Sequence, residues 1–330
     1  MAAPFLASEG DYVDRALGGF ARANADVVAL HTDPVFVQAV APDPARVVGI
    51  VSGGGSGHEP MHAGLVGRGM LDAAVPGKVF ASPHNRQVYQ ASNAVAGPEG
   101  VLHIVKNYTG DRINFGIAAE RLRHDGIRVE RVLIDDDIAT DSADTTTGRR
   151  GTGATILVEK LLGAAADTGL GLSELAELGA RIAARSRSIA VAAQAHTSPA
   201  TGRLAFDLSD GEVEYGVGIH GERAARSVPR PPLEELVGRM LDDVLAGTPA
   251  GDRALLLVNG LGATTGIELH NVYAIAADAI AERGISLGGS LVGTWTPALD
   301  MKGFSLTVTM LQDDWQALWD APVWTATLRK

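Results

Sequence analysis

Four glycines fall within five residues at positions 53–57 (GGGSG), and His58 follows directly. Glycine weakens helices and strands, so this run favours a turn in which the backbone comes close to another group. An apolar, β-branched stretch at residues 46–50 precedes it and predicts a strand. We therefore expect a glycine turn that carries exposed N–H groups and His58 to the carboxyl end of a strand, where open α/β sheets bind ligands.

Three common glycine motifs do not fit this run. A phosphate-binding P-loop would continue into Gly-Lys-Ser/Thr, which is absent here. The dinucleotide fingerprint and the nucleophile elbow each require a glycine at the position of His58. A Gly-x-Ser-x-Gly pattern does occur at residues 284–288, but it precedes a predicted strand instead of following one.

The stretch from His58 to His62 matches the zinc-protease pattern His-Glu-x-x-His. That chemistry needs both imidazoles on one face of a regular helix, together with a third ligand. Pro60 between the histidines and the preceding glycines disfavour such a helix. The zinc site is therefore not the favoured interpretation, and a purely structural strand-to-helix turn is a second alternative.

Strand and helix patterns alternate along the chain, which predicts α/β architecture. A length of 330 residues accommodates two domains. We expect an N-terminal domain at residues 1–185 with a doubly wound, largely parallel sheet, and a C-terminal domain at residues 186–330 with a mixed sheet and helices. Expected strands are 46–50, 101–105, 129–134, 188–193, 254–258, 287–292 and 304–310, with a further one entered through a turn at 76–82. Expected helices are 61–70, 87–96, 113–124, a segment ending near 166, 173–184, 233–246, 266–283 and 313–319, with an amphipathic opening segment at 7–26.

Three predicted strands end in polar clusters, at the glycine run, at residues 106–111 (KNYTGD) and at residues 135–137 (DDD). Carboxyl ends of parallel strands meet at one edge of a sheet, so this edge is the expected site. The acidic triplet is a candidate Mg²⁺ site, although solvated charge at a strand end is the favoured interpretation.

The net charge of −11 argues against nucleic acid or an anionic membrane as a partner. The absence of cysteine excludes disulfides, thiol catalysis and cysteine-bound metals, and it fits a reducing compartment. The N-terminus lacks a signal-peptide pattern and no apolar run is long enough to span a membrane. We therefore expect a cytoplasmic protein.

His220 lies between Gly218 and Gly221, which favours display over burial in a core, although a packed histidine remains an alternative. Neutral imidazole is a competent nucleophile and base near pH 7. Together with His58, Lys106 and Asp111, it is a candidate site for a small carbonyl compound, since such chemistry needs an acid–base partner.

Eight motifs in order resemble the substrate-binding K subunits of dihydroxyacetone kinases over nearly the whole chain. They are residues 53–60 (GGGSGHEP), 106–111 (KNYTGD), 135–137 (DDD), 148–151 (GRRG), 216–222 (GVGIHGE), 258–264 (VNGLGAT), 299–305 (LDMKGFS) and 318–323 (LWDAPV).

The resemblance implies two α/β domains, a homodimer and a short ketose held covalently as a hemiaminal. In the matching motifs, His220 would add to the carbonyl and His58 would be the base that deprotonates the hydroxyl to be phosphorylated. Asp111 would assist hemiaminal formation or proton transfer. The groups that would hydrogen-bond the substrate are Lys106, Gly55, Ser56 and Gly57.

The resemblance also implies that this chain holds no metal or nucleotide cofactor. A separate, nucleotide-binding L-type subunit would supply Mg-ATP, or ADP that a phosphotransferase protein recharges. Residues 84–86 (HNR), Ile113 and Gly116 depart from the family pattern, which leaves open whether the ketose has three carbons or four, as in erythrulose. A non-catalytic ketose-sensing co-activator is the remaining alternative, and retention of His58 and Asp111 argues against it.

Overall fold

The computed structural model describes residues 5–6, 12–140, 148–223, 227–312 and 314–330. The chain forms two units, each built on its own six-stranded sheet. The first unit comprises residues 1–133, 158–180 and 317–330, and the second comprises residues 134–157 and 181–316. The expected single boundary after residue 185 thus differs from this division, because the chain passes between the units within α4 and α5 as well as at two other points.

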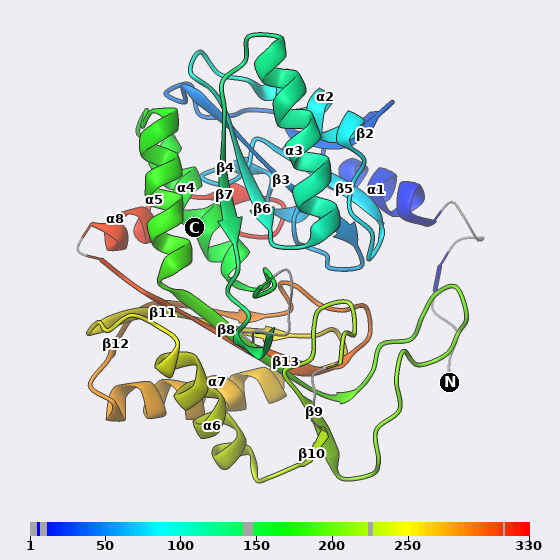
Figure 1. The fold of residues 1–330 in the computed structure, drawn as a ribbon, viewed down its shortest axis with the longest axis vertical. Coiled ribbons are helices and arrows are strands. Elements are labelled where there is room, and N and C mark those ends of the chain that lie inside the picture. The colour runs from blue at the N-terminus through cyan, green and yellow to red at the C-terminus, as the bar shows by residue number, and fades with distance from the viewer. Residues whose placement is uncertain (1–4, 7–11, 141–147, 224–226, 313) are drawn as a thin grey trace. The chain divides into compact units, whose positions relative to one another are not determined.

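The first unit is organised around a sheet with the strand order β1-β2-β5-β3-β6-β7 (Figure 1). β3 runs parallel to both β5 and β6, whereas the β1–β2 and β2–β5 pairs are antiparallel. The strand bounds are Val28–Thr32 (β1), Val35–Ala39 (β2), Val48–Ser56 (β3), Ala73–Val79 (β5), Gly100–Lys106 (β6) and Val129–Ile134 (β7). The parallel centre places the carboxyl ends of β3 and β6 side by side.

Helices α2 (Asn85–Val95) and α3 (Thr109–His124) cover this sheet through a shared apolar core. Val88 of α2 and Phe115 of α3 are buried there against strand residues such as Val101. The unit also contains α1 (Tyr12–Ala23), the 3₁₀ turn Ala63–Leu65, the short β4–β14 ladder (Gly67–Arg68 with Trp324–Thr325), and most of α4 (Ala154–Ala166) and α5 (Leu172–Ala184).

The second unit contains a mixed sheet with the order β10-β9-β8-β13-β11-β12. β11 and β12 are parallel and the other neighbouring pairs are antiparallel. Its strands are Ser186–Gln194 (β8), Glu212–Tyr215 (β9), Ser227–Pro229 (β10), Arg253–Gly260 (β11), Ser286–Gly293 (β12) and Lys302–Met310 (β13). The α/β class and the mixed second sheet agree with the sequence-based prediction.

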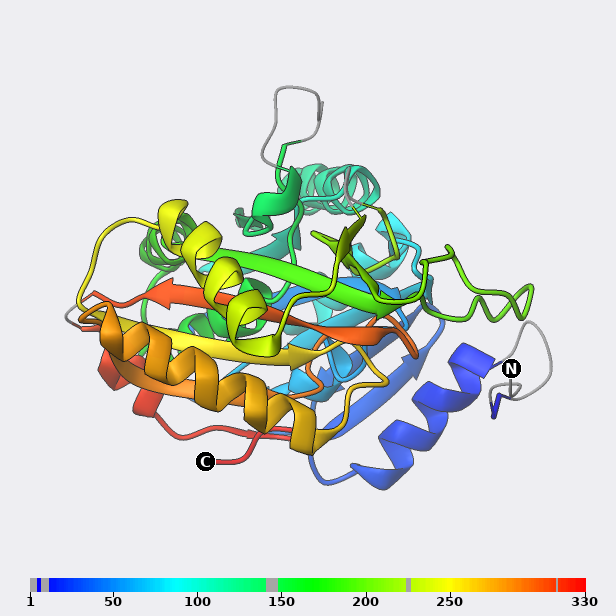
Figure 2. The ribbon, with the colours of Figure 1, turned by 90° about the horizontal axis from the view of Figure 1, so that it is seen from below.

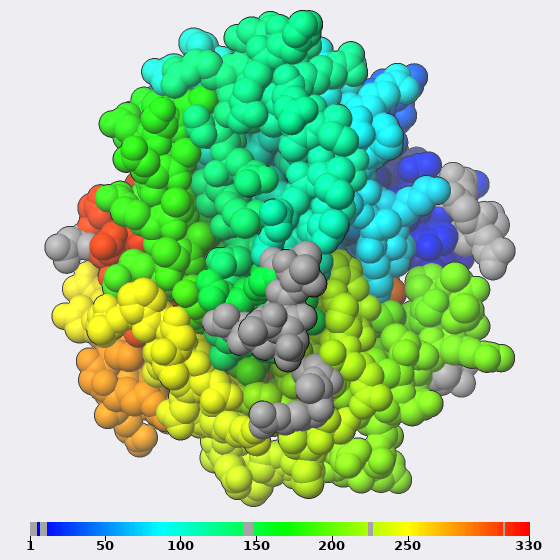
Figure 3. Space-filling view, viewed as in Figure 1, coloured from blue at the N-terminus to red at the C-terminus, as the bar shows by residue number. Residues whose placement is uncertain are grey.

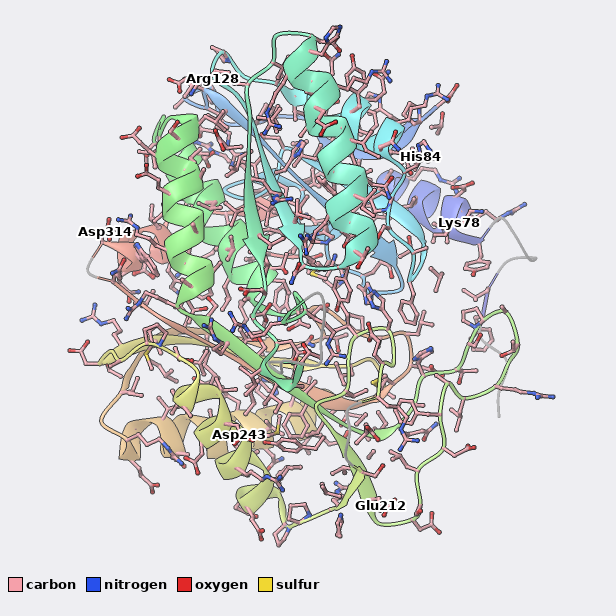
Figure 4. The ribbon with its side chains drawn as sticks, in the orientation of Figure 1. Lys78, His84, Arg128, Glu212, Asp243 and Asp314 are labelled. Carbon is pink, nitrogen blue, oxygen red and sulfur yellow. The ribbon has the colours of Figure 1, made fainter. Side chains whose placement is uncertain are left out.

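Helices α6 (Leu233–Ala246) and α7 (Gly266–Glu282) lie on one face of this sheet, as the turned view shows (Figure 2). Their apolar residues form a core with β8, β11 and β13. Asp243 of α6, labelled in Figure 4, accepts a 2.6 Å hydrogen bond from the hydroxyl of Tyr215 on β9. The chain ends with α8 (Trp315–Asp320) and β14. Within the described ranges, every helix is too short or too polar to cross a lipid bilayer.

Two predictions about local structure are wrong. The strand before the histidine continues to Ser56, so Gly53, Gly54 and Gly55 belong to β3 and are buried. Residues 61–70 form no regular helix but a 3₁₀ turn and β4, and a helix could not continue through Gly67 and Gly69, whose φ angles are 145° and 79°.

Several smaller differences concern the ends and number of elements. β5 begins at Ala73, before the predicted turn, and the short strands β1, β2, β4, β9, β10 and β14 had no predicted counterpart. Two expectations fall partly outside the described residues, namely the opening segment at residues 7–11 and residue 313 at the start of the last predicted helix.

Candidate active site

The glycines of β3 leave room for a buried lysine. A Cβ atom on Gly54 would lie 2.1 Å from Nζ of Lys106 and 3.3 Å from Nε2 of His62. A Cβ on Gly53 would meet the carbonyl oxygen of Val75 at 2.5 Å, within the sheet itself. The glycine run therefore serves close packing on both sides of β3, and only Gly54 makes room for the lysine ammonium.

Lys106 ends β6 and is 1% exposed. Its Nζ lies 2.9 Å from Nε2 of His62 and 3.3 Å from the carbonyl oxygen of Gly53, and it approaches Oδ2 of Asp111 to 3.9 Å. Burial lowers the pKa of Lys106, while the carboxylates of Asp111 and Glu159 act in the opposite direction. The ammonium is thus held at the carboxyl end of the strand by several short contacts.

Asp111 lies in the first turn of α3, which begins at Thr109 rather than at the predicted residue 113. The positive end of the helix dipole favours a carboxylate at this position. The side chain is buried, and within the described part of the chain its Oδ1 has no hydrogen-bond partner. A buried acceptor of this kind normally has a partner, so Oδ1 is suited to a donor from a ligand.

His58 follows the end of β3 and is 1% exposed, with its ring stacked on Phe80 at a centroid distance of 5.0 Å. Gly57 precedes it with a φ of 100°, a conformation that glycine adopts without strain. The hydroxyl of Ser56 donates to the carbonyl oxygen of Gly77 at 2.7 Å. Its proton is therefore already used, and only its oxygen lone pairs remain for a ligand.

The zinc-protease alternative does not fit this geometry. Residues 58–62 form turns instead of a helix. Nδ1 of His62 lies 2.6 Å from Oε1 of Glu159, and its Nε2 faces the Lys106 ammonium, so neither nitrogen points to a cation site. Among the described residues, no group of three or more His, Cys, Asp and Glu side chains is arranged to hold a metal ion.

In the second unit, His220 is paired with Glu222. Nδ1 of His220 lies 2.8 Å from Oε1 of Glu222, and the backbone N–H of His220 donates to Oε2 at 2.9 Å. Burial acts to raise the pKa of Glu222, but the hydrogen bond and charge of His220, with the charge of Arg150, lower it to about 2. An ionised carboxylate only accepts, so in the neutral imidazole the proton is on Nδ1 and Nε2 carries the lone pair.

Gly218 is required for this arrangement, because a Cβ there would lie 2.0 Å from Oε2 of Glu222 and 2.4 Å from Nη1 of Arg150. Arg150 in turn forms an ion pair with Asp137 and donates to the carbonyl oxygen of Gly216. Glu222 was not among the residues predicted for the site. Its position two residues after a glycine-flanked histidine is the signal that could have identified it.

Two carboxylates of the acidic triplet after β7, those of Asp136 and Asp137, are buried rather than solvated, contrary to the favoured interpretation. Asp136 accepts hydrogen bonds from the backbone of Thr152 and Ala154 before and at the start of α4, as well as from the hydroxyl of Ser188. Asp137 is buried against Arg150, and burial raises its pKa to about 6. The remaining member, Asp135, is paired with Arg149. These carboxylates hold α4 and its loop in place.

The structure places the predicted residues in two groups. The first unit contains the glycine run, Ser56, His58, Lys106 and Asp111, and brings Lys106 and Asp111 together. The second unit contains His220. His62 was considered only as a zinc ligand and not as a neighbour of Lys106. Glu159, which contacts His62, was not predicted at all, and no spacing links it to the glycine run.

Two departures from the family pattern also have a structural account. His84, labelled in Figure 4, is the N-cap of α2: its side chain accepts from the backbone of Arg86, and Gln87 completes the capping box. Ile113 lies on the outer face of α3 with 54% exposure. The space-filling view shows α3, in teal, on the surface of the first unit (Figure 3).

Comparisons with known proteins agree with these motifs. The Dak1 domain model matches residues 18–327. The dihydroxyacetone-binding subunit of the PEP-dependent dihydroxyacetone kinase of Escherichia coli is 41% identical, with 96% of each chain covered. The solved dihydroxyacetone kinase of C. freundii superimposes with a TM-score of 0.91 at 36% identity, over 100% of this chain and 60% of that one. A dihydroxyacetone kinase operon co-activator, Dha-DhaQ, has a TM-score of 0.88 at 31% identity, over 95% of this chain and 96% of that one. The chain therefore belongs to the Dak1 domain family.

Proposed function

We propose that this protein is the dihydroxyacetone-binding subunit of a kinase and that it presents the ketose for phosphorylation. The observation that carries the proposal is the full-length similarity to the E. coli dihydroxyacetone-binding subunit, with a lysine, a buried carboxylate and two histidines at the matching motifs. A small ketone offers few contacts, so these polar groups must supply most of its recognition.

His220 is proposed to hold the ketose as a hemiaminal. Nε2 would add to the carbonyl carbon, the C=O double bond would become a single bond, and the oxygen would take up a proton from solvent. The ring would release its Nδ1 proton to solvent by way of Glu222, which leaves a neutral hemiaminal. The developing positive charge on the ring would be stabilised by the ionised Glu222 at Nδ1. A covalent tether fixes the hydroxyl to be phosphorylated, which removes much of the orientational entropy from the transfer step.

The remaining roles are proposed for the first unit. Lys106, with backbone groups of Gly55 and Gly57 and the side chain of Ser56, would hydrogen-bond the ketose. His58 would remove the proton of the reacting hydroxyl, and Asp111 would assist proton transfer through Oδ1.

The phosphoryl donor is proposed to come from a separate nucleotide-binding subunit. Gly53, Gly54 and Gly55 lie within β3, with Gly53 against Val75 and Gly54 against Lys106, so they do not form a loop that could cradle phosphates. The acidic triplet, the candidate Mg²⁺ site, is already bound by protein groups: Arg149 pairs with Asp135, the hydroxyl of Thr152 donates to Asp136, and Arg150 pairs with Asp137. Mg-ATP, or ADP recharged by a phosphotransferase protein, would therefore be held by the partner. A homodimer of this chain is also proposed.

A ketose-sensing co-activator is the second candidate, because the Dha-DhaQ co-activator shares the fold. A sensor needs a group that captures the ketose but no base for the hydroxyl. His58 and Asp111 are both present and buried, which favours the kinase subunit.

The test is phosphorylation of dihydroxyacetone, and of a four-carbon ketose, by the purified protein with and without a nucleotide-binding subunit of a related kinase. Ketose phosphate formed only in the mixture supports the proposal, and the ratio of the two products identifies the ketose. Ketose binding without phosphate transfer in every mixture would favour the co-activator.

A further inference from the structure

A buried polar chain in the first unit leads away from Lys106. Nζ of Lys106 contacts Nε2 of His62, and Nδ1 of His62 contacts both Oε1 of Glu159 at 2.6 Å and Oγ of Ser52 at 3.1 Å. All four side chains are at least nine-tenths buried, and Glu159 and Ser52 are fully so. The proposed function uses Lys106 alone, so the other three residues need an explanation.

The hydrogen-bond partners determine where the proton of His62 resides. A lysine ammonium can only donate, so Nε2 of His62 must accept from it. The hydroxyl of Ser52 donates to the carbonyl oxygen of Ile104 at 2.9 Å, so toward Nδ1 its oxygen acts as an acceptor. Two independent neighbours thus require the same tautomer, in which Nδ1 carries the proton and Nε2 does not.

Glu159 is compatible with this tautomer whether or not it is ionised. Burial raises its pKa to about 8, with the charge of Lys106 acting in the opposite direction. Within the described residues, its Oε2 has no hydrogen-bond partner and is the oxygen left to carry a proton. In either state Oε1 accepts from Nδ1–H of His62.

This arrangement fixes the direction of the lysine. Two of its three N–H groups are directed to His62 and to the carbonyl oxygen of Gly53. The third N–H group remains on the side of Asp111. Nζ lies 3.9 Å from Oδ2 of Asp111, which is beyond hydrogen-bonding distance. Oδ1 of Asp111 has no hydrogen-bond partner in the described part of the chain. The donor is this N–H group of Lys106 and the acceptor is Oδ1 of Asp111. A ligand that carries both a carbonyl group and a hydroxyl group could bond to both of them.

We propose that His62 is a positioning residue, which Ser52 and Glu159 hold as the Nδ1–H tautomer so that its Nε2 orients the Lys106 ammonium toward the ketose. The inference rests on the proposed function, because it takes Lys106 to contact the ketose. It adds that the orientation depends on an acceptor at the position of Nε2 and not only on the bulk of a side chain.

Two substitutions at His62 separate the acceptor from the packing. In His62→Gln the amide oxygen can occupy the place of Nε2 and still accept from Lys106. In His62→Asn the shorter amide reaches only the place of Nδ1, so the contact with Glu159 can remain but Lys106 loses its acceptor. Lys106→Ala is the reference for loss of the lysine, and thermal unfolding of each variant reports on the fold.

Calorimetric titration with dihydroxyacetone is the readout. We expect His62→Asn to weaken binding about 10- to 100-fold, close to the effect of Lys106→Ala, as for loss of a hydrogen bond to a charged group. His62→Gln should bind within about threefold of the wild type, since a neutral acceptor is restored. Equal losses in both His62 variants would overturn the inference, and so would wild-type affinity in His62→Asn when Lys106→Ala is impaired.

Imidazole ¹⁵N NMR of the ligand-free protein tests the tautomer without any ligand. A His62 signal with the proton on Nδ1 supports the inference, and a proton on Nε2 overturns it while leaving the proposed function intact. Failure of the wild-type protein to bind dihydroxyacetone would instead overturn the proposed function together with the ligand-orienting role. The two failures are therefore distinguishable.

Discussion

Gly54→Ala is expected to weaken ketose binding while leaving the fold in place. The new Cβ would lie 2.1 Å from Nζ of Lys106, where ordinary contact begins near 3.4 Å, so the ammonium must move by about 1.3 Å, the difference between these distances. A shift of that size breaks the 2.9 Å contact with His62 and moves the donor away from the ligand.

The magnitude follows from the single hydrogen bond at stake. A hydrogen bond involving a charged group contributes about 1.5–3 kcal/mol, so binding of dihydroxyacetone should weaken about 10- to 150-fold. The backbone of β3 is not directly affected, because the nearest atom is the end of a side chain. The unfolding temperature should therefore fall only modestly.

Two other glycine substitutions serve as controls. In Gly53→Ala the Cβ would meet the backbone oxygen of Val75 at 2.5 Å, so this variant should lose stability as well as binding. Gly18→Ala on α1 has no atom within 4 Å of the new Cβ, so it should leave binding unchanged and, because alanine is the better helix former, should not lower stability. Calorimetry with the ketose and thermal unfolding measure both quantities. Wild-type affinity in Gly54→Ala, with an unchanged fold, would refute the placement of Lys106 at the ligand.

Three further predictions follow from the geometry. His58→Asn should still bind the ketose but lose turnover with the partner subunit by about 10²–10⁴-fold, the usual contribution of a positioned general base; near wild-type turnover would reduce His58 to a structural residue. The folded-state pKa of Glu222, about 2, lies below its ordinary value of 4.5, so its ionisation stabilises the fold above pH 4.5 and this contribution is lost as the pH falls toward 2. The gap in unfolding free energy between the wild type and Glu222→Gln should accordingly narrow over that range, and a gap independent of pH would contradict the pairing with His220. Calorimetry with Mg-ATP on the protein alone should show no saturable binding, and saturation would contradict the need for a nucleotide-bearing partner.

The sequence was a good guide where one local signal determined the outcome. Helices α6 and α7 were predicted almost to the residue, because apolar periodicity and turn residues define them. The glycine run misled because local propensity treats glycine as a strand breaker, whereas Gly54 is required inside β3 by Lys106, a residue 52 positions away. Local sequence carries no record of such a contact.

The candidate site was predicted to a similar extent. Residues within short motifs, such as His58, Asp111 and His220, could be named as candidates from the motifs and the resemblance, and their roles stay predictions. Glu159 was not, because it reaches His62 from a helix 97 residues further along the chain. The charges at 135–137 were taken for solvated ones because their partners, Arg150 among them, become neighbours only in the folded unit.

The most direct test of the account is the intact mass of the protein after exposure to dihydroxyacetone, compared between the wild type, His220→Ala and Glu222→Gln. The account predicts an increase equal to the mass of one ketose in the wild type. It predicts no adduct in His220→Ala, and a reduced yield in Glu222→Gln because its neutral amide stabilises the charged ring less well. An adduct of equal yield in His220→Ala would contradict the central claim that this imidazole holds the ketose.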